Sequence, residues 1–97
     1  MAVTVTGNSI ALTAAGDSWP ERVYLKGIRL VTNADLVPTA AQETNLRTVS
    51  ASGPDILNVE LSTAHSTAFF DFSHGRDFDG VYCAALQTNV TVYLDIL

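Results

Sequence analysis

Short runs in which apolar and polar residues alternate, broken by turn-forming residues, constrain the fold of this chain most. The clearest run covers residues 90–96 and reads Val-Thr-Val-Tyr-Leu-Asp-Ile. A period of two places successive side chains on opposite faces of a β-strand. The run therefore predicts a strand with one apolar, core-facing side and one half-polar, outward-facing side.

A second β-rich run, residues 81–86, precedes it across the polar step Thr88-Asn89, so we expect a C-terminal hairpin. A two-residue turn would place Val92 opposite Ala85. A three-residue turn would instead turn the face that carries Tyr82 and Ala84 toward the core, because a one-residue slip exchanges the faces of a strand. The sequence leaves both registers open. Residues 81–86 are apolar on both faces, which favours a strand covered by the core on one side and by a partner subunit on the other.

The first third of the chain predicts a hairpin and a β-bulge. Gly7-Asn8 separates two apolar pairs, and a two-residue turn there places Val5 opposite Ile10 and Val3 opposite Leu12. In residues 22–32 the apolar positions change face at Lys26-Gly27. One extra residue at that point, a β-bulge with glycine, would return all of them to one face.

The remaining chain reads as strands near 46–49, 57–61 and 68–72 and as loops at 14–20, 50–55 and 73–80. Pro38 followed by residues 39–43 is compatible with one short helical turn that has proline at its first position. About eight short strands without a long helix predict an all-β fold, an antiparallel β-sandwich or barrel. We expect residues 1–97 to form a single domain, without repeats or linkers.

Composition restricts the partners of the chain. Charged residues make up 15% of it, against ~25% in typical soluble domains. The net charge of −5 argues against nucleic acid, whose binding depends on basic patches. The apolar runs are too short to cross a membrane, and the single cysteine, Cys83, has no partner for an internal disulfide. No signal segment opens the chain, so we expect synthesis in a reducing cytoplasm.

One cluster of acidic residues and a histidine has the chemistry of a cation site. Asp71, His74, Asp77 and Asp79 place oxygen ligands near a glycine, as calcium loops do, but their spacing does not match an EF-hand and acidic residues are common in turns. No phosphate-binding glycine loop is present either, so we expect no metal and no cofactor.

A hydrolase would pair a histidine, His65 or His74, with a nucleophile such as Cys83. Cys83 lies inside an apolar strand, where thiols are usually inert packing residues, and no nucleophile-elbow spacing occurs. We therefore expect no catalytic residues and no enzymatic activity.

The aromatic residues Trp19, Tyr24, Tyr82 and Tyr93 have two interpretations. They could form a stacking platform for a sugar, since each ring has an apolar body and a polar edge. The more common role of such residues is to pack a sheet and rim a protein interface. We expect Tyr82, Ala84 and Tyr93, with Trp19 and Tyr24, to contribute to a subunit interface.

Three segments carry a family resemblance: Ala15-Gly16-Asp17, the run from Val23 to Val31 with its Lys-Gly-Ile step, and Val90-Thr91-Val92-Tyr93-Leu94. They resemble the small β-rich structural proteins of tailed bacteriophage virions, including capsid decoration or cement proteins. The resemblance implies a protein on the capsid surface that binds the major capsid protein and itself, often as a homotrimer, without a catalytic site. A carbohydrate-binding or host-recognition module of a head fibre or tail is the alternative.

Overall fold

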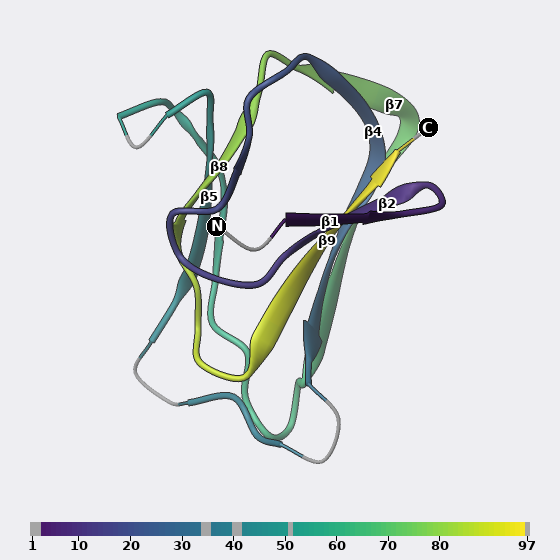
Figure 1. The fold of residues 1–97 in the computed structure, drawn as a ribbon. Helices are drawn as coiled ribbons and strands as arrows, with labels where there is room; N and C mark the ends of the chain where they lie inside the picture. Colours follow the sequence, from purple (N-terminus) through teal and green to yellow (C-terminus); the bar gives the residue numbers. More distant parts are fainter. Residues whose placement is uncertain (1–2, 34–35, 40–41, 51, 97) are drawn as a thin grey trace.

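The structure, a computed structural model, describes residues 3–33, 36–39, 42–50 and 52–96. Within them nine strands form two antiparallel sheets packed face to face, and no helix is present (Figure 1). The predicted all-β sandwich is therefore confirmed. The strands are β1 (Val3–Thr6), β2 (Ser9–Leu12), β3 (Ser18–Trp19), β4 (Val23–Thr32), β5 (Thr44–Thr48), β6 (Asp55–Val59), β7 (Thr67–Phe78), β8 (Val81–Ala85) and β9 (Val90–Ile96).

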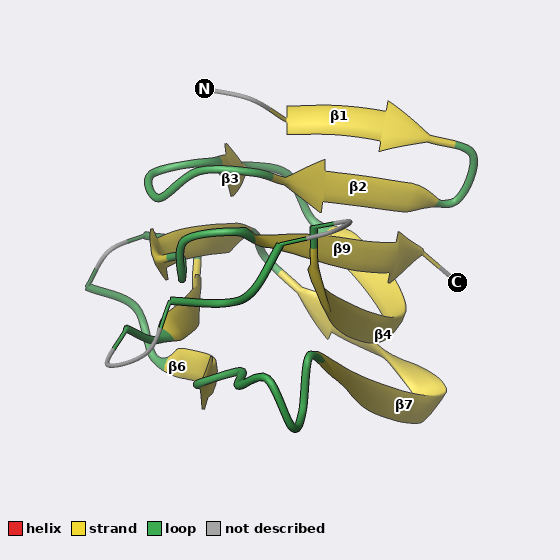
Figure 2. Cartoon of the chain, turned by 90° about the horizontal axis from the view of Figure 1, so that it is seen from below, coloured by secondary structure: helices red, strands yellow, loops and turns green. Residues whose placement is uncertain are grey.

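The strand order is that of a jelly roll. Sheet A has the order β1-β2-β9-β4-β7, and sheet B has the order β3-β8-β5-β6. If β1 is left out, the strand orders are β2-β9-β4-β7 and β3-β8-β5-β6. Consecutive strands therefore lie in different sheets at every connection except the one from β5 to β6. This pattern of two Greek keys defines the double-sheet jelly roll. β1 is an addition at the edge of sheet A (Figure 2).

The N-terminal hairpin has the predicted register. Val5 pairs with Ile10, and Val3 pairs with Leu12. Gly7 is the first residue of the two-residue turn and has a φ of 57°. A type II′ turn requires a positive φ, and so favours glycine, at this position. Turn chemistry and alternation agree here, and the local sequence is sufficient to specify the hairpin.

The predicted bulge in β4 is also confirmed. The pairing of β4 with both neighbours shifts between Leu25 and Gly27, and Val23, Leu25, Ile28 and Leu30 are all buried. On β7 the same irregularity spans residues 72–75, which lie between the partners of Gly27 and Leu25. Both strands curve strongly at one end of the sandwich, where they remain side by side (Figure 1).

The predicted C-terminal hairpin is wrong. β8 lies between β3 and β5 in sheet B, whereas β9 lies between β2 and β4 in sheet A, so the connection through Thr88-Asn89 crosses from one sheet to the other. Neither hairpin register therefore applies. The alternation of the two runs still identifies core residues, because Val81 and Cys83 on β8 and Val92 and Leu94 on β9 are all buried in the core between the sheets. The pattern identifies buried positions and does not identify the strand neighbours.

The buried side chain of Gln87 anchors the chain where it crosses between the sheets. Its side chain is fully buried, accepts a hydrogen bond from the amide of Leu61 (2.8 Å), and donates to the carbonyls of Leu61 (2.8 Å) and Thr39 (2.9 Å). Its own amide donates to the hydroxyl of Thr44 (3.2 Å). A buried polar side chain needs such partners, so Gln87 joins the β8–β9 crossing to two other connections at this end of the sandwich.

Two predicted loops contain strands. The loop at 14–20 carries β3, since Gly16 donates to the carbonyl of Cys83 (2.8 Å) and Cys83 donates to that of Asp17 (2.9 Å), which fixes this segment on β8. The loop at 73–80 is mostly β7, which extends to Phe78 because it pairs with the first half of β4. The described residues of the predicted helical turn, 38–39 and 42–43, are not helical, and residues 40–41 lie outside the described residues.

Candidate functional site

The outer face of sheet A carries an aromatic row that crosses four strands. Ala11 pairs with Tyr93, Tyr93 with Arg29, and Arg29 with Phe69, so these four side chains lie next to one another on β2, β9, β4 and β7. The guanidinium of Arg29 lies 4.8 Å from the ring centroid of Tyr93, within the range of a cation–π contact. Phe69 is 57% exposed, although its residue type is usually buried. These four residues, Ala11, Tyr93, Arg29 and Phe69, are called the aromatic row after its two rings.

An ion pair fixes the row from one side. Asp95 accepts two hydrogen bonds from Arg29, from Nε at 2.8 Å and from Nη2 at 3.0 Å, and a third from the hydroxyl of Ser9 at 2.7 Å. Burial by itself would raise the pKa of Asp95, but the hydrogen bonds from Arg29 and Ser9 outweigh it, so the pKa lies below its usual value. The hydrogen bonds that Arg29 donates to Asp95 in turn raise the pKa of Arg29. Asp95 is therefore a buried, charged anchor.

Gly27 determines where the Phe69 ring lies. A Cβ at position 27 would be 2.9 Å from two carbons of the Phe69 ring and 2.9 Å from the carbonyl oxygen of Phe70. Only glycine permits this approach, so the residue that forms the bulge also leaves space for the ring. A shallow hollow adjoins it, lined by Arg29, Leu30, Val31, Thr67, Ala68 and Phe69.

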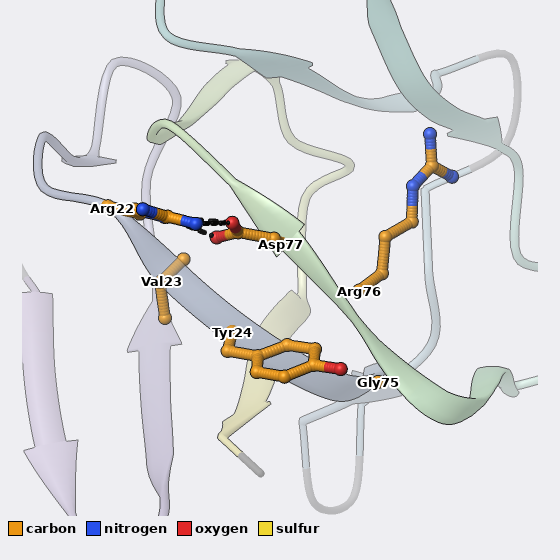
Figure 3. Close-up of a pocket in the computed structure, with 6 residues that line it drawn as sticks. All are labelled: Arg22, Val23, Tyr24, Gly75, Arg76 and Asp77. Atoms are coloured by element: carbon orange, nitrogen blue, oxygen red, sulfur yellow. Dashed lines mark hydrogen bonds and ion pairs between the residues drawn. The ribbon is translucent and has the colours of Figure 1, made fainter.

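A second surface feature, the β4–β7 trough, lies near the curved ends of these strands. It is lined by Arg22, Val23, Tyr24, Gly75, Arg76 and Asp77 (Figure 3). The Tyr24 ring is 47% exposed, and its hydroxyl donates to the carbonyl of His74 (2.8 Å). In Figure 3 the Arg76 side chain points away from the Arg22–Asp77 pair. It lies instead over the rings of Phe78 (5.2 Å) and Phe72 (6.0 Å).

Arg22 and Asp77 form an ion pair across the trough. Nε of Arg22 donates to Oδ1 (3.0 Å) and Oδ2 (2.8 Å) of Asp77, and Nη2 also donates to Oδ2. The hydrogen bonds lower the pKa of Asp77 and raise that of Arg22. Both groups face solvent, where an ion pair adds little to stability, so this pair acts mainly as a fixed polar edge beside Tyr24.

The expected interface residues do not form one surface. Tyr82 and Ala84 lie on β8 in sheet B and are half-buried, whereas Tyr93 lies on β9 in sheet A. Because the two strands face each other across the core, their outward side chains point to opposite sides of the sandwich. Trp19 is half-buried and packs against the core, and Tyr24 lies on the other sheet, in the trough.

The residues considered for catalysis and metal binding are not brought together. Cys83 is fully buried, and burial, with a smaller effect of Asp17, raises its pKa to about 11. His65 and His74 are both exposed, on the β6–β7 connection and on β7. Asp77 of the proposed cation loop is paired with Arg22. Over the described ranges, no group of three His, Cys, Asp or Glu side chains is arranged to hold a metal ion.

Sequence reasoning missed Arg29, Phe69 and Asp95. Each one is on an outward position of an alternating run, which marks it as exposed and says nothing about its neighbours. They meet only because β9 and β7 flank β4. The one local signal was the glycine at position 27, which predicted a bulge but not the ring that lies over it.

Comparisons with protein-family models, with curated protein sequences and with solved structures found no match to this chain. The fold and the surfaces therefore define a class only, a jelly-roll sandwich whose notable features are open faces and shallow hollows. Among the described residues, no helix has the length and apolarity needed to cross a membrane.

Proposed function

We propose that this protein is a structural component of a phage-type virion, a decoration protein that binds the assembled shell and other copies of itself. The observation that carries the proposal is the aromatic row on sheet A. Exposed Phe69 and half-buried Tyr93 and Arg29 are residue types enriched at protein interfaces, and the buried Asp95 holds Arg29 in place over the Tyr93 ring.

The jelly roll supports the proposal by analogy. It is common among viral capsid and lectin domains, although a fold alone does not define a function. The resemblance of residues 23–31 and 90–94 to phage virion proteins points in the same direction. Low charge content adds support, because it leaves broad neutral surfaces for contact with protein.

A decoration protein works by many modest contacts. A stable protein interface buries ~800 Å² on each partner, and oligomers attached at several points gain avidity without new contacts. The aromatic row supplies the apolar centre of such a contact, with Thr67, Asp71 and Ser9 as its polar surroundings on the same sheet.

The proposal is tested with empty tailed-phage capsids that lack their decoration proteins. Wild-type protein should sediment with the capsids at a fixed copy number and raise their melting temperature. Phe69→Ser should abolish both effects, because it removes the largest exposed apolar side chain of the row. Val37→Ser, a change at a valine that is 59% exposed on a different segment, is the matched control and should bind normally. Absence of binding by the wild-type protein, or normal binding by Phe69→Ser, would contradict the proposal.

The β4–β7 trough favours a second candidate, a carbohydrate-binding module for host recognition. An exposed aromatic ring beside an Arg–Asp pair offers stacking and bidentate hydrogen bonds, the two contacts that sugars require. A glycan array should then give saturable binding that Tyr24→Ala removes, while Tyr82→Ala, a change on the opposite sheet, retains it. Trp19 is a poor reporter, because it packs against the core.

A further inference from the structure

The outer edge of β1 differs from the rest of the sandwich. β1 is the last strand of sheet A, and within the described part of the chain it pairs with β2 alone (Figure 2). Val5 shares the core-facing side with its partner Ile10, yet Val5 is 52% exposed while Ile10 is fully buried. The Val5 side chain therefore lacks the cover that sheet B gives to Ile10 on the neighbouring strand.

The backbone of Val5 also faces the open edge. In a hairpin closed by a two-residue turn, the flanking residues, here Thr6 and Ser9, form a hydrogen-bonded pair, and such pairs alternate along the ladder. Thr4 then bonds to Ala11, and the N–H and C=O of Val5 point away from β2. An exposed strand edge is a template for another strand. β1 has none of the lysine, proline or bulge residues that commonly protect such edges.

Charge indicates which strand this edge accepts. The chain carries a net charge of −5, so two copies repel one another over most of their surface. Residues 1–16 contain no Asp, Glu, Lys or Arg, and the first charged residue of the chain, Asp17, is buried. The β1 edge is thus a place where two copies meet without apposing like charges. An antiparallel twofold pair centred on Val5 places the Val5 side chains of the two copies beside each other.

We propose that β1 pairs with β1 of a second copy of this chain, which joins the two five-stranded sheets into one continuous sheet. The pairing satisfies the outward N–H and C=O of Val5 and packs Val5 of each copy against the other. A four-residue edge makes a small contact, so the dimer is of the weak, reversible class that buries less than ~1,200 Å² in total. A twofold contact gives dimers, in contrast to the trimers that the family resemblance implies.

Sedimentation equilibrium over ~1 µM to ~1 mM, a range that covers weak complexes, tests the proposal with purified protein alone. The wild-type protein should show a monomer–dimer equilibrium. Val5→Pro removes the outward N–H without removing a bond to β2, and Val5→Lys places a charge on the exposed edge. Each change should raise the dimer dissociation constant at least ~10-fold. Val37→Lys, at an equally exposed valine elsewhere, should leave it unchanged.

The use of two variants, Val5→Pro and Val5→Lys, keeps the test valid if one of them fails to fold. Thermal unfolding should give both of them a melting temperature close to that of Val37→Lys. If Val5→Pro is unfolded, Val5→Lys decides the result. A monomeric wild-type protein at the highest concentration, a trimer, or dimers unaffected by Val5→Lys would overturn the proposal. Capsid binding is not part of this measurement. A failure of dimerisation would therefore overturn this pairing and leave the capsid-binding part of the proposed function to its own test.

Discussion

Arg29 and Asp95 form a two-point ion pair between β4 and β9, with Nε–Oδ2 at 2.8 Å and Nη2–Oδ1 at 3.0 Å. Ser9 on β2 donates a third hydrogen bond to the same carboxylate. One buried side chain therefore connects three neighbouring strands on the outer face of sheet A. It also holds the Arg29 guanidinium over Tyr93.

Asp95→Asn should destabilise the fold by about 1.5–3 kcal/mol, the range for losing a hydrogen bond to a charged group. The reason is that a neutral amide accepts fewer bonds than the carboxylate and leaves Arg29 without a counter-charge. Urea unfolding measures the change. Asp71→Asn, at an exposed carboxyl on the same face, is the control and should change stability by less than ~0.5 kcal/mol. Equal effects of the two substitutions would show that the ion pair has no special role.

Stability should fall in acid because of the same group. The pKa of Asp95 is lower in the folded protein than in the unfolded chain, where an aspartate has a pKa of ~3.9. Its stabilising contribution is complete above that unfolded value and is lost as the pH falls through the folded value. The difference in unfolding free energy between the wild type and Asp95→Asn should therefore shrink below about pH 4. A difference that stays constant down to about pH 2 would contradict the assignment.

Gly27→Ala should destabilise the protein by about 1–3 kcal/mol, the usual cost of overpacking. The new methyl group would contact both the Phe69 ring and the carbonyl oxygen of Phe70 at 2.9 Å. Phe69→Ala removes only the first of these contacts. In a double-mutant cycle, the cost of Gly27→Ala should thus be smaller in the Phe69→Ala background but not zero. Full relief would show that the backbone contact is unimportant.

Gln87→Leu should destabilise strongly, by about 1–3 kcal/mol for each buried backbone group left unpaired. The buried groups concerned are the amide and carbonyl of Leu61. The carbonyl of Thr39, an exposed residue, also loses its hydrogen bond, but water can replace it. Gln42→Leu offers a matched control, because exposed Gln42 accepts one hydrogen bond, from the amide of Thr88. Thermal unfolding should separate the two variants clearly. A similar melting temperature for both would refute the role of Gln87 in the crossing.

Cys83 should not react with an aromatic disulfide reagent at pH 8 in the folded state. Its thiol is buried and its pKa is raised to about 11, so little thiolate forms, and reagent does not reach it. Unfolding in guanidinium should release one reactive thiol per chain. Rapid labelling of the native protein would contradict the buried position.

The local sequence predicted the parts of this fold that depend on neighbouring residues. Gly7-Asn8 specified the β1–β2 hairpin, and Lys26-Gly27 specified the bulge, since both depend on turn chemistry and on alternation within one segment. Alternation in 90–96 also identified Val90, Val92 and Leu94 as core residues. These signals arise from backbone preferences and from the side-chain period of a strand.

The tertiary structure decided which strands lie side by side. β8 and β9 have the pattern of a hairpin but lie in opposite sheets. Arg29 and Asp95 are 66 residues apart in the sequence and meet because β4 pairs with β9. Alternation indicates which face of a strand is buried. It does not select the neighbouring strand, because every strand with the same period is an equally good partner. The choice among such partners depends on buried polar groups such as Gln87 and on packing between the sheets, which no local pattern contains.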